Sequence, residues 1–479
     1  MSLFATKPLD LILSDAEGGT LKRSLSATQL VALGIGAIIG AGLFSLTGLA
    51  AAQNAGPAVV ISFTLAAIGC AFAGLCYSEF ATMIPIAGSA YTYSYATMGE
   101  LLAWIIGWDL VLEYAVGAST VAVSWSGYLL SLFKDFGINF PAELAASPFE
   151  PVTLPGTTTV IHGVINLPAL FIVVAVSAVL IVGIQESAQV NTVIVMLKIS
   201  VAVLFILLGW AYIDSKNYTP FVPPNTGEFG VYGWSGVLRG AGKVFFAFIG
   251  FDAVSTAAQE AKKPQRDMPI GIVGSLAVCT LLYVVFSHVL TGIVNYRDLN
   301  VAAPVAVAID HTSYGWLRPA VKLAIILGFT SVILVMLLGQ SRVFFSMSHD
   351  RLLPKIFGEV HPRFRTPWRS NLLFMAFTGV FAAFAPLSAL GDMTSIGTLF
   401  AFVLVCIGII VMRRTHPERY RPFRTPFVPA VPILGIAFNL FLMFGLGLAN
   451  WIRLFGWMGL GLIIYFNYSR KRSITSGAR

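Results

Sequence analysis

The feature that most constrains this chain is a succession of long apolar segments, each nearly free of charge and separated by short polar stretches. A segment of about 20 apolar residues is as long as a helix that crosses the hydrocarbon layer of a membrane. A window of that length marks the following segments: 27–53, 57–83, 100–132, 165–185, 188–213, 238–260, 269–294, 317–347, 368–386, 392–412, 429–449 and 451–468. The pattern predicts an all-α polytopic membrane protein with about 12 transmembrane helices.

The composition indicates an environment of lipid rather than water. Of the 479 residues, 57% are hydrophobic and only 11% are charged, whereas a soluble chain carries about 25% charged residues. The four cysteines lie inside apolar runs without a metal-binding spacing, so we expect neither a disulfide nor a metal site. The chain also lacks the GxSxG, HExxH and GxxxxGK(S/T) patterns of hydrolases, zinc proteases and nucleotide-driven pumps. We therefore expect no enzyme activity and no cofactor.

The charges indicate how the chain sits in the membrane. The net charge is +8, but the basic residues lie in short loops between apolar segments, which argues against a nucleic-acid partner. Most of the 30 Lys and Arg residues fall in the loops that would be cytoplasmic if both termini were cytoplasmic. Cytoplasmic loops are enriched in Lys and Arg. We therefore expect a multi-pass protein of the cytoplasmic membrane, with the lipid bilayer as its surroundings and both termini inside.

Glycines interrupt two segments at matching places. Gly40 and Gly42 lie in the middle of the first segment, and Gly250 lies in the middle of the sixth. Interrupted segments at corresponding positions in two halves are typical of transporters built from inverted repeats. The alternative is that the small residues serve only close helix packing.

A helix that unwinds inside the membrane frees backbone groups that need a polar partner. The N–H groups at Gly40, Ala41 and Gly42 would favour a carboxylate, because they open the second half of a helix. Carbonyl groups ending the first halves would favour an ammonium, and they belong to Ile38, Ile39, Ala247 and Ile249. One zwitterion satisfies both sets, so the sequence predicts a binding site for an α-amino acid.

Three stretches then resemble the signature segments of the amino acid–polyamine–organocation (APC) transporter family: Gly40–Phe44, Phe248–Asp252, and Glu260 followed by Lys263–Pro269. The chain is most similar to bacterial members of the cationic amino acid transporter branch. The resemblance implies a five-plus-five inverted repeat (LeuT-like) with discontinuous first and sixth helices and two more helices at the end. In the position where relatives often have Ser or Thr, this chain has Ala41, so that hydroxyl contact to substrate is missing.

The resemblance also implies roles for two charged residues inside segments. Lys198 matches a lysine that bridges the first, fifth and eighth helices in proton-coupled relatives, so we expect it to couple proton movement to gating. Glu113 matches a pocket carboxylate near the amine of the substrate, and Asp109 precedes it on the same helix face. The alternative for both Lys198 and Glu113 is a permanently hydrogen-bonded structural role.

Further residues are candidates for gating and selectivity. Asp252 is expected to cap the second half of the sixth helix, and Glu79 is expected in a gate with Glu260, Arg266 or Lys22. Side-chain selectivity is assigned to residues behind the breaks: Phe246, Phe251, Ser331, Val335 and Met336.

These inferences divide the chain into a tail 1–24, a first five-helix repeat 25–213, a second repeat 238–412, two additional helices 429–469 and a tail 470–479. The predicted function is proton-coupled symport of amino acids by alternating access, with small neutral amino acids favoured and H⁺ as the coupling ion. Amino acid exchange and transport of Arg or Lys are alternatives on the same fold, and an ion channel is a more distant one. The sequence leaves open a small membrane subunit or a homo-oligomer as partner.

Overall fold

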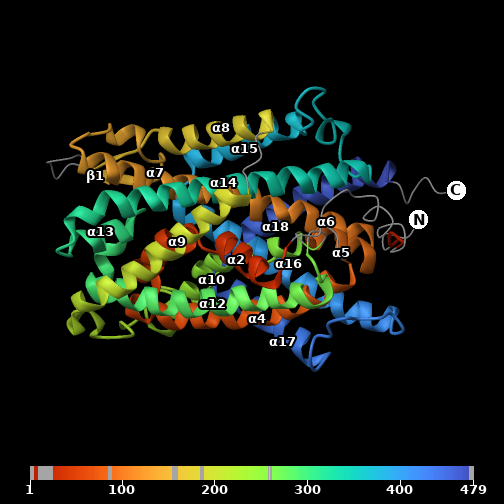
Figure 1. Ribbon diagram of the computed structural model, residues 1–479, viewed down its shortest axis with the longest axis horizontal. Helices are drawn as coiled ribbons and strands as arrows, with labels where there is room; N and C mark the ends of the chain where they lie inside the picture. The colour runs from red at the N-terminus through yellow and green to blue at the C-terminus, as the bar shows by residue number, and fades with distance from the viewer. Residues whose placement is uncertain are drawn as a thin grey trace.

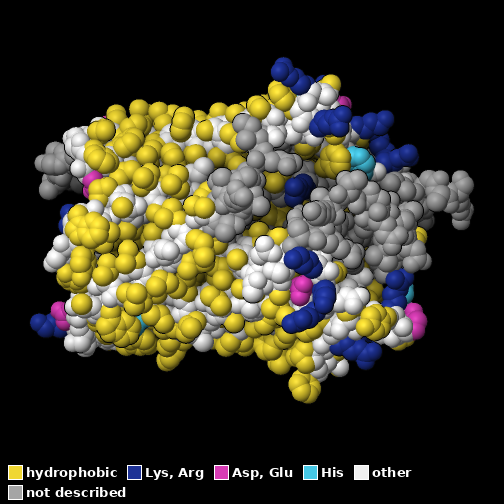
Figure 2. Space-filling view, in the orientation of Figure 1, with side chains coloured by type: hydrophobic (Ala, Val, Ile, Leu, Met, Phe, Trp, Pro, Cys, Tyr) yellow, Lys and Arg dark blue, Asp and Glu magenta, His cyan; other side chains and the backbone are white. Residues whose placement is uncertain are grey.

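The computed structural model describes residues 5–8, 25–84, 89–153, 160–183, 188–256, 258 and 261–473. Helices dominate the described chain, and most of them run roughly along the long axis of the molecule (Figure 1). Figure 2 shows hydrophobic side chains over most of the visible face, with Lys and Arg gathered mainly towards one end. This distribution is that of a membrane protein, whose apolar surface meets lipid.

The described residues up to 213 contain fourteen helical elements, listed in order. They are α2 (Ala27–Ile38), η1 (Gly42–Leu46), α3 (Thr47–Ala50), η2 (Ala51–Ala55), η3 (Gly56–Ala58), α4 (Val59–Met83), α5 (Ser89–Thr97), α6 (Glu100–Val111), η4 (Leu112–Val116), α7 (Gly117–Asp135), η5 (Ala142–Leu144), α8 (Leu167–Val182) and α9 (Ala188–Gly209), which continues into η6 (Trp210–Tyr212). The elements η1, η2 and η4 are π-helical turns inside longer helices. Such turns are frequent at functional sites.

The second half begins after the short turn η7 (Ser215–Tyr218). Its elements are α10 (Gly233–Val244), η8 (Phe245–Phe248), α11 (Ala253–Thr256), α12 (Pro264–Ile293), η9 (Tyr296–Leu299), α13 (Pro304–Asp310), η10 (Gly315–Leu317), α14 (Arg318–His349), η11 (Lys355–Phe357), α15 (Trp368–Phe384), α16 (Leu387–Thr415), α17 (Ala430–Gly445), α18 (Leu448–Asn467) and η12 (Ser469–Lys471). Each predicted segment therefore coincides with helical structure.

The prediction of an all-α chain needs one small correction. Strands β1 (Pro151–Thr153) and β2 (Val160–His162) pair antiparallel, with Val152 opposite Ile161. This ribbon belongs to the loop between α7 and α8, where the polar composition does not favour a membrane-spanning helix.

Among the residues that the structure describes, seven helical stretches are long and apolar enough to cross a membrane. They are Gly42–Met83, Glu100–Asp135, Val193–Tyr212, Pro264–Ile293, Gly315–His349, Leu387–Thr415 and Leu448–Lys471. Three shorter apolar helices accompany them: α2, α8 and α17. The protein is therefore a multi-pass membrane protein, and the full set of twelve crossings in two inverted repeats stays a prediction.

Both ends of the described chain meet at the start of α6. The backbone N–H of Glu100 donates to the carbonyl of Ala5 at 3.1 Å, and the N–H of Lys7 donates to the carbonyl of Tyr95 at 3.1 Å. The hydroxyl of Ser473 also contacts the Glu100 carboxylate. We call this side of the bundle the terminal end, and the opposite side, which carries β1, β2 and α13, the loop end (Figure 1).

Candidate functional site

The first predicted segment is interrupted at the predicted place. Helix α2 ends at Ile38, and Ile39 is extended with φ −72° and ψ 109°. Helical structure resumes at the π-helical turn η1, which begins at Gly42. Close packing also involves glycines of this segment: a Cβ on Gly36 would lie 2.3 Å from a methyl group of Val195 in α9.

The sixth segment is interrupted in the same manner. The 3₁₀ turn η8 ends at Phe248, and Ile249 is extended with φ −60° and ψ 133°. Gly250 follows with φ +117°, a conformation that L residues with a Cβ rarely adopt. A Cβ on Gly250 would also lie 2.7 Å from the carbonyl oxygen of Ala37 in α2. Glycine is therefore required at this position both for its φ and for the close approach of the two backbones.

The two breaks lie directly against each other. A Cβ on Gly42 would lie only 2.2 Å from the Cα of Ala247, so the start of η1 touches η8 through backbone atoms. Segments more than 200 residues apart thus bring their freed peptide groups to one place. The N–H groups in the first turn of a helix have no partner within that helix, which makes the start of η1 suited to an anion.

A tyrosine that the sequence analysis missed joins the two breaks. The hydroxyl of Tyr283, in α12, lies 3.0 Å from the carbonyl oxygen of Ile38 and 2.9 Å from that of Ala247. Its single proton can serve only one of these carbonyls at a time. Ile38 and Ala247 are two of the four residues whose carbonyls were predicted to receive a substrate ammonium. The only sequence signal is a hydroxyl group in the middle of an apolar segment.

Lys198 lies where the resemblance placed it. Its Nζ donates to the carbonyl of Gly36 at 2.6 Å and to that of Ile39 at 3.1 Å, and the residue is 2% exposed. Its alkyl chain packs on Gly328 of α14, where a Cβ would lie 2.7 Å from Cδ. The ammonium therefore sits at the negative end of α2 and connects α9, α2 and α14. Its role in proton coupling stays a prediction.

Carboxyl groups gather beside the second break. Glu113 lies in the π-helical turn η4, and Asp109 lies one turn earlier in α6; both are 1% exposed. The Glu113 carboxyl is a close neighbour of Asp252 and Thr398. Within the described part of the chain, no hydrogen-bond partner of good geometry reaches a carboxylate oxygen of Glu113 or Asp109. Buried charges of this kind are costly unless a proton or a cation offsets them.

Asp252 occupies the position just before α11, as expected for a cap. Its side chain, however, accepts a hydrogen bond from the hydroxyl of Tyr114 at 3.2 Å, which ties the second break to η4. The capping role itself stays a prediction.

The predicted selectivity residues are mostly buried, with one correction. Phe246, Phe251, Ser331 and Met336 are each at most 7% exposed, whereas Val335 is 39% exposed and faces outward. Its neighbour Val332 takes the inward position, because a Cβ on Gly40 would lie 3.5 Å from a Val332 methyl group. Because a helix turns about 100° per residue, Val335 lies about 100° around α14 from the buried Met336, which turns it towards the outer surface.

Four further predicted substrate contacts are buried inside the bundle. The Phe251 ring lies 5.7 Å from Tyr77 and 5.0 Å from Phe402. The Met336 sulfur would lie 3.3 Å from a Cβ on Gly117 of α7. Ala41 and Ile249 are buried in the breaks themselves.

The structure gives Glu79 partners that the sequence did not predict. Arg413, at the end of α16, donates to both Glu79 carboxylate oxygens at 2.9 and 2.8 Å, and Arg421 forms an ion pair with it at 3.3 Å. The N–H of Thr425 adds a bond of 2.7 Å. Burial lowers the pKa of the Arg421 guanidinium, and Glu79 opposes that effect. Arg266 takes no part in these contacts, and Glu260 and Lys22 lie outside the described residues.

A polar network that the sequence analysis also missed lies towards the loop end. The buried Lys243, in α10, donates to the side chain of Gln53 at 2.8 Å, and Gln53 donates to Asn300 at 2.8 Å. Asp392 in α16 is an electrostatic neighbour of Lys243 and accepts from Asn450 at 3.1 Å. The network joins η2, α10, the turn after η9 and α16 on one side of the two breaks.

The bundle, its two facing breaks and the lysine bridge define a membrane transporter of small solutes. Comparison with known proteins gives the family: a model described as "Amino acid permease" matches residues 25–458. The chain belongs to the amino acid permease family of APC transporters. The relatives are transporters and permeases, not enzymes.

Three relatives show the range of this family. The chain is 45% identical to the "Branched-chain amino acid permease BcaP" of Bacillus subtilis, over 98% of each chain. It is 43% identical to the "Methylthioribose transporter" of the same organism, over 99% of each chain. It is 34% identical to the human "Cationic amino acid transporter 4", over 82% of this chain and 60% of the relative.

Proposed function

We propose that this protein is a proton-coupled symporter that carries neutral aliphatic amino acids across the cytoplasmic membrane by alternating access. It would do so with twelve crossings, arranged as two inverted five-helix repeats and two further helices, and with both termini in the cytoplasm. The observation that carries the proposal is the direct contact of the two helix breaks at Gly42 and Ala247. Membrane-embedded backbone is left without helical partners only where it serves a cavity or a ligand.

The two ends of an amino acid fit the two kinds of freed group. The substrate carboxylate would meet the N–H groups of Gly40, Ala41 and Gly42, where the positive end of the η1 helix points. The substrate ammonium would meet the carbonyls of Ile38 and Ala247, which accept from Tyr283 in the structure. Substrate binding would thus replace one hydroxyl donor with a charged donor, which forms stronger hydrogen bonds.

The side chain of the substrate would face an apolar wall. Val332 and Met336 of α14 lie on the side that meets the first break and α7, and Phe246 adds an aromatic ring. An apolar wall favours Ala and the branched-chain amino acids over charged ones. The name of the BcaP relatives supports the same substrate class.

A second substrate class is favoured by one observation. Among the described residues, no Lys or Arg lies within ion-pair distance of Asp109 or Glu113, although both are buried. A cationic substrate side chain would offset these carboxylates, as would bound protons. Transport of Arg or Lys is therefore the alternative, as is exchange instead of symport.

Proton coupling would involve Lys198. A buried lysine loses its proton more easily than an exposed one. The charged form holds the carbonyls of Gly36 and Ile39, and the neutral form would release them, freeing the end of α2 to move.

The test is uptake into proteoliposomes that contain the purified chain. Labelled Ala, Leu, Val, Arg, Lys and methylthioribose would each be offered with and without an inward proton gradient. We expect gradient-stimulated uptake of the neutral amino acids. Uptake of methylthioribose alone, a solute without carboxylate or ammonium, would contradict the zwitterion site, and uptake that requires internal amino acid would indicate exchange.

A further inference from the structure

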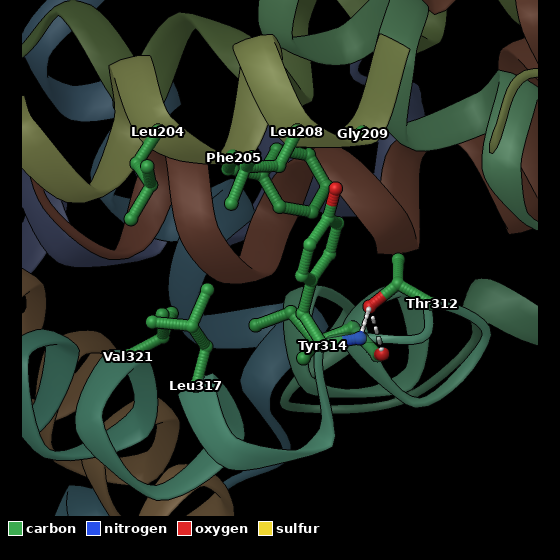
Figure 3. Close-up of a pocket in the computed structure, with 9 residues that line it drawn as sticks. Leu204, Phe205, Leu208, Gly209, Thr312, Tyr314, Leu317 and Val321 are labelled. Atoms are coloured by element: carbon green, nitrogen blue, oxygen red, sulfur yellow. Dashed lines mark hydrogen bonds between the residues drawn. The ribbon is translucent and has the colours of Figure 1, made fainter. Parts of the chain in front are cut away.

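A groove that the proposed transport site does not use opens at the loop end. It lies between the last turns of α9 and the segment that joins α13 to α14, and it is open on one side, with an internal volume of about 30 Å³ (Figure 3). Leu204, Phe205 and Leu208 form one wall, and Leu317 and Val321 form the opposite wall. Figure 3 shows the ring of Tyr314 standing between the two walls.

The groove faces lipid. The stretch Val193–Tyr212 is apolar and long enough to cross the membrane, and Leu204 and Leu207 on its surface are 37% and 68% exposed. Trp210 directly follows α9 and Trp316 lies in η10, two residues before the start of α14; they are 57% and 77% exposed. Exposed tryptophans of this kind mark the membrane–water interface. The groove therefore opens into the hydrocarbon layer, just below the headgroups of one leaflet.

The chemistry of the groove selects its occupant. Its walls are almost entirely hydrocarbon, so water would find too few hydrogen-bond partners to fill it. A cation follows the lining residue Leu317 in the chain: Arg318 forms an ion pair with Asp310 at 3.2 Å, donates to the Asp310 carbonyl at 3.3 Å and keeps a side chain that is 36% exposed. Arginine binds phosphate well through its fork of N–H groups. An apolar groove beside an arginine suits a phospholipid, because the groove can take one acyl chain and the arginine can bind the phosphate.

We propose that this groove binds one acyl chain of a membrane phospholipid, with Arg318 contacting the phosphate. The site joins the two helices that also hold Lys198, because α9 carries that lysine and Gly328 of α14 packs against its alkyl chain. A lipid in the groove would act as a spacer between α9 and α14. Lipid binding itself does not depend on which solute the protein carries.

The experiment uses the full chain in nanodiscs of phosphatidylglycerol that contain a small fraction of the same lipid with a photoreactive diazirine in one acyl chain. After illumination, labelled peptides are mapped by mass spectrometry. We expect labelling at 204–209 and 317–321 to exceed that of other lipid-facing stretches several-fold. Labelling spread evenly around the bundle would overturn the proposal, as would cross-linked dimers in place of lipid adducts.

Adjacent residues provide matched variants. Leu208→Trp fills the groove, whereas Leu207→Trp adds the same bulk on the outward face of the same turn. We expect the first variant to lose groove labelling several-fold and the second to keep it. Equal labelling in both would overturn the site. Val321→Phe fills the opposite wall and serves if Leu208→Trp does not give a monodisperse protein.

The headgroup contact has its own test. A diazirine diacylglycerol has the same acyl chains but lacks the phosphate. We expect the unaltered chain to favour the phosphatidylglycerol probe at the groove, and Arg318→Gln to remove that preference while acyl labelling persists. A preference that survives Arg318→Gln would overturn the role given to this arginine.

Discussion

The ammonium of Lys198 lies 2.6 Å from the carbonyl oxygen of Gly36. A side chain of α9 thus binds a backbone carbonyl near the end of α2, inside the helix bundle. The same group reaches the carbonyl of Ile39 at 3.1 Å. Carbonyls that end a helix carry the negative end of its dipole, and a cation there stabilises the interruption. Two hydrogen bonds therefore connect the Lys198 ammonium to the end of α2.

Replacement of Lys198 by Met is expected to abolish stimulation of uptake by a proton gradient. The apolar side chain keeps the length of the alkyl chain that packs on Gly328 but cannot hold the two carbonyls. The freed carbonyls should also lower the free energy of unfolding by about 1–3 kcal/mol. Uptake of labelled Leu with and without the gradient checks the first effect, and thermal unfolding checks the second.

Lys216→Met is the control, because Lys216 lies exposed in the loop after α9. It should retain gradient-stimulated uptake. Undiminished stimulation in Lys198→Met would show that Lys198 has only a structural role.

The breaks could be predicted from the sequence, but their contacts could not. Gly40, Gly42 and Gly250 stand out because glycine in the middle of an apolar helix indicates a local departure from helical structure. Tyr283 and Lys243 give no such signal, because their importance comes from carbonyl and amide groups of residues far away in sequence. Likewise, the sequence predicts Glu79 in a gate, but its partner Arg413 follows it by 334 positions. Only the packed helices bring such pairs together.

Replacement of Gly250 by Ala is expected to reduce both stability and uptake strongly. At φ +117° a Cβ is strained, and here it would also lie 2.7 Å from the Ala37 carbonyl oxygen. The left-handed backbone alone costs about 1–2 kcal/mol, and the clash would force the two breaks apart. The measurements are the midpoint of thermal unfolding and the initial rate of uptake.

Two other glycines serve as controls that distinguish the effect of the positive φ from the effect of the close contact with Ala37. Gly227 has a φ of +95° but open space around its Cβ position, and Gly459 lies in α18 with open space as well. Gly227→Ala should show a modest loss of stability and Gly459→Ala none. A Gly250→Ala variant that behaves like Gly227→Ala would mean that the contact with Ala37 is unimportant.

Replacement of Tyr283 by Phe should destabilise the substrate-free protein more than the substrate-bound protein. The variant leaves the carbonyls of Ile38 and Ala247 without the hydroxyl that both approach, which costs about 1–3 kcal/mol for buried groups. If a substrate ammonium takes over these carbonyls, added Leu should restore part of the loss. The shift in unfolding temperature on adding Leu should therefore be larger in Tyr283→Phe than in the unaltered chain.

Tyr420→Phe is the matched control, since Tyr420 is 77% exposed. An unchanged or smaller shift in Tyr283→Phe would argue against an ammonium at this position.

Replacement of Glu79 by Gln is expected to loosen the loop between α16 and α17. The Glu79 carboxylate is fully buried and holds Arg413, Arg421 and the N–H of Thr425. Removing one partner of a buried ion pair typically costs about 3–5 kcal/mol, although Arg413 is 26% exposed and water can offset part of this loss. Limited proteolysis within 416–427 and thermal unfolding would measure the effect.

Glu359→Gln is the control. It breaks the ion pair between Glu359 and Arg369, whose two side chains are each more than 40% exposed, and it should leave both measurements unchanged. Equal behaviour of the two variants would show that the Glu79 cluster does not hold the loop.

Replacement of Glu113 by Gln separates the two substrate classes. The variant keeps the shape of the side chain but removes its negative charge beside Asp252. If Glu113 offsets a cationic substrate side chain, Gln should abolish uptake of Arg and Lys. If the substrate is neutral, as proposed, uptake of Leu and Ala should persist, with an altered dependence on pH because one buried carboxyl can no longer bind a proton.

Asp109→Asn is the comparison, one turn away on the same helix and equally buried. Loss of neutral amino acid uptake in Glu113→Gln but not in Asp109→Asn, with normal thermal stability, would place Glu113 in contact with the zwitterion itself rather than with the substrate side chain.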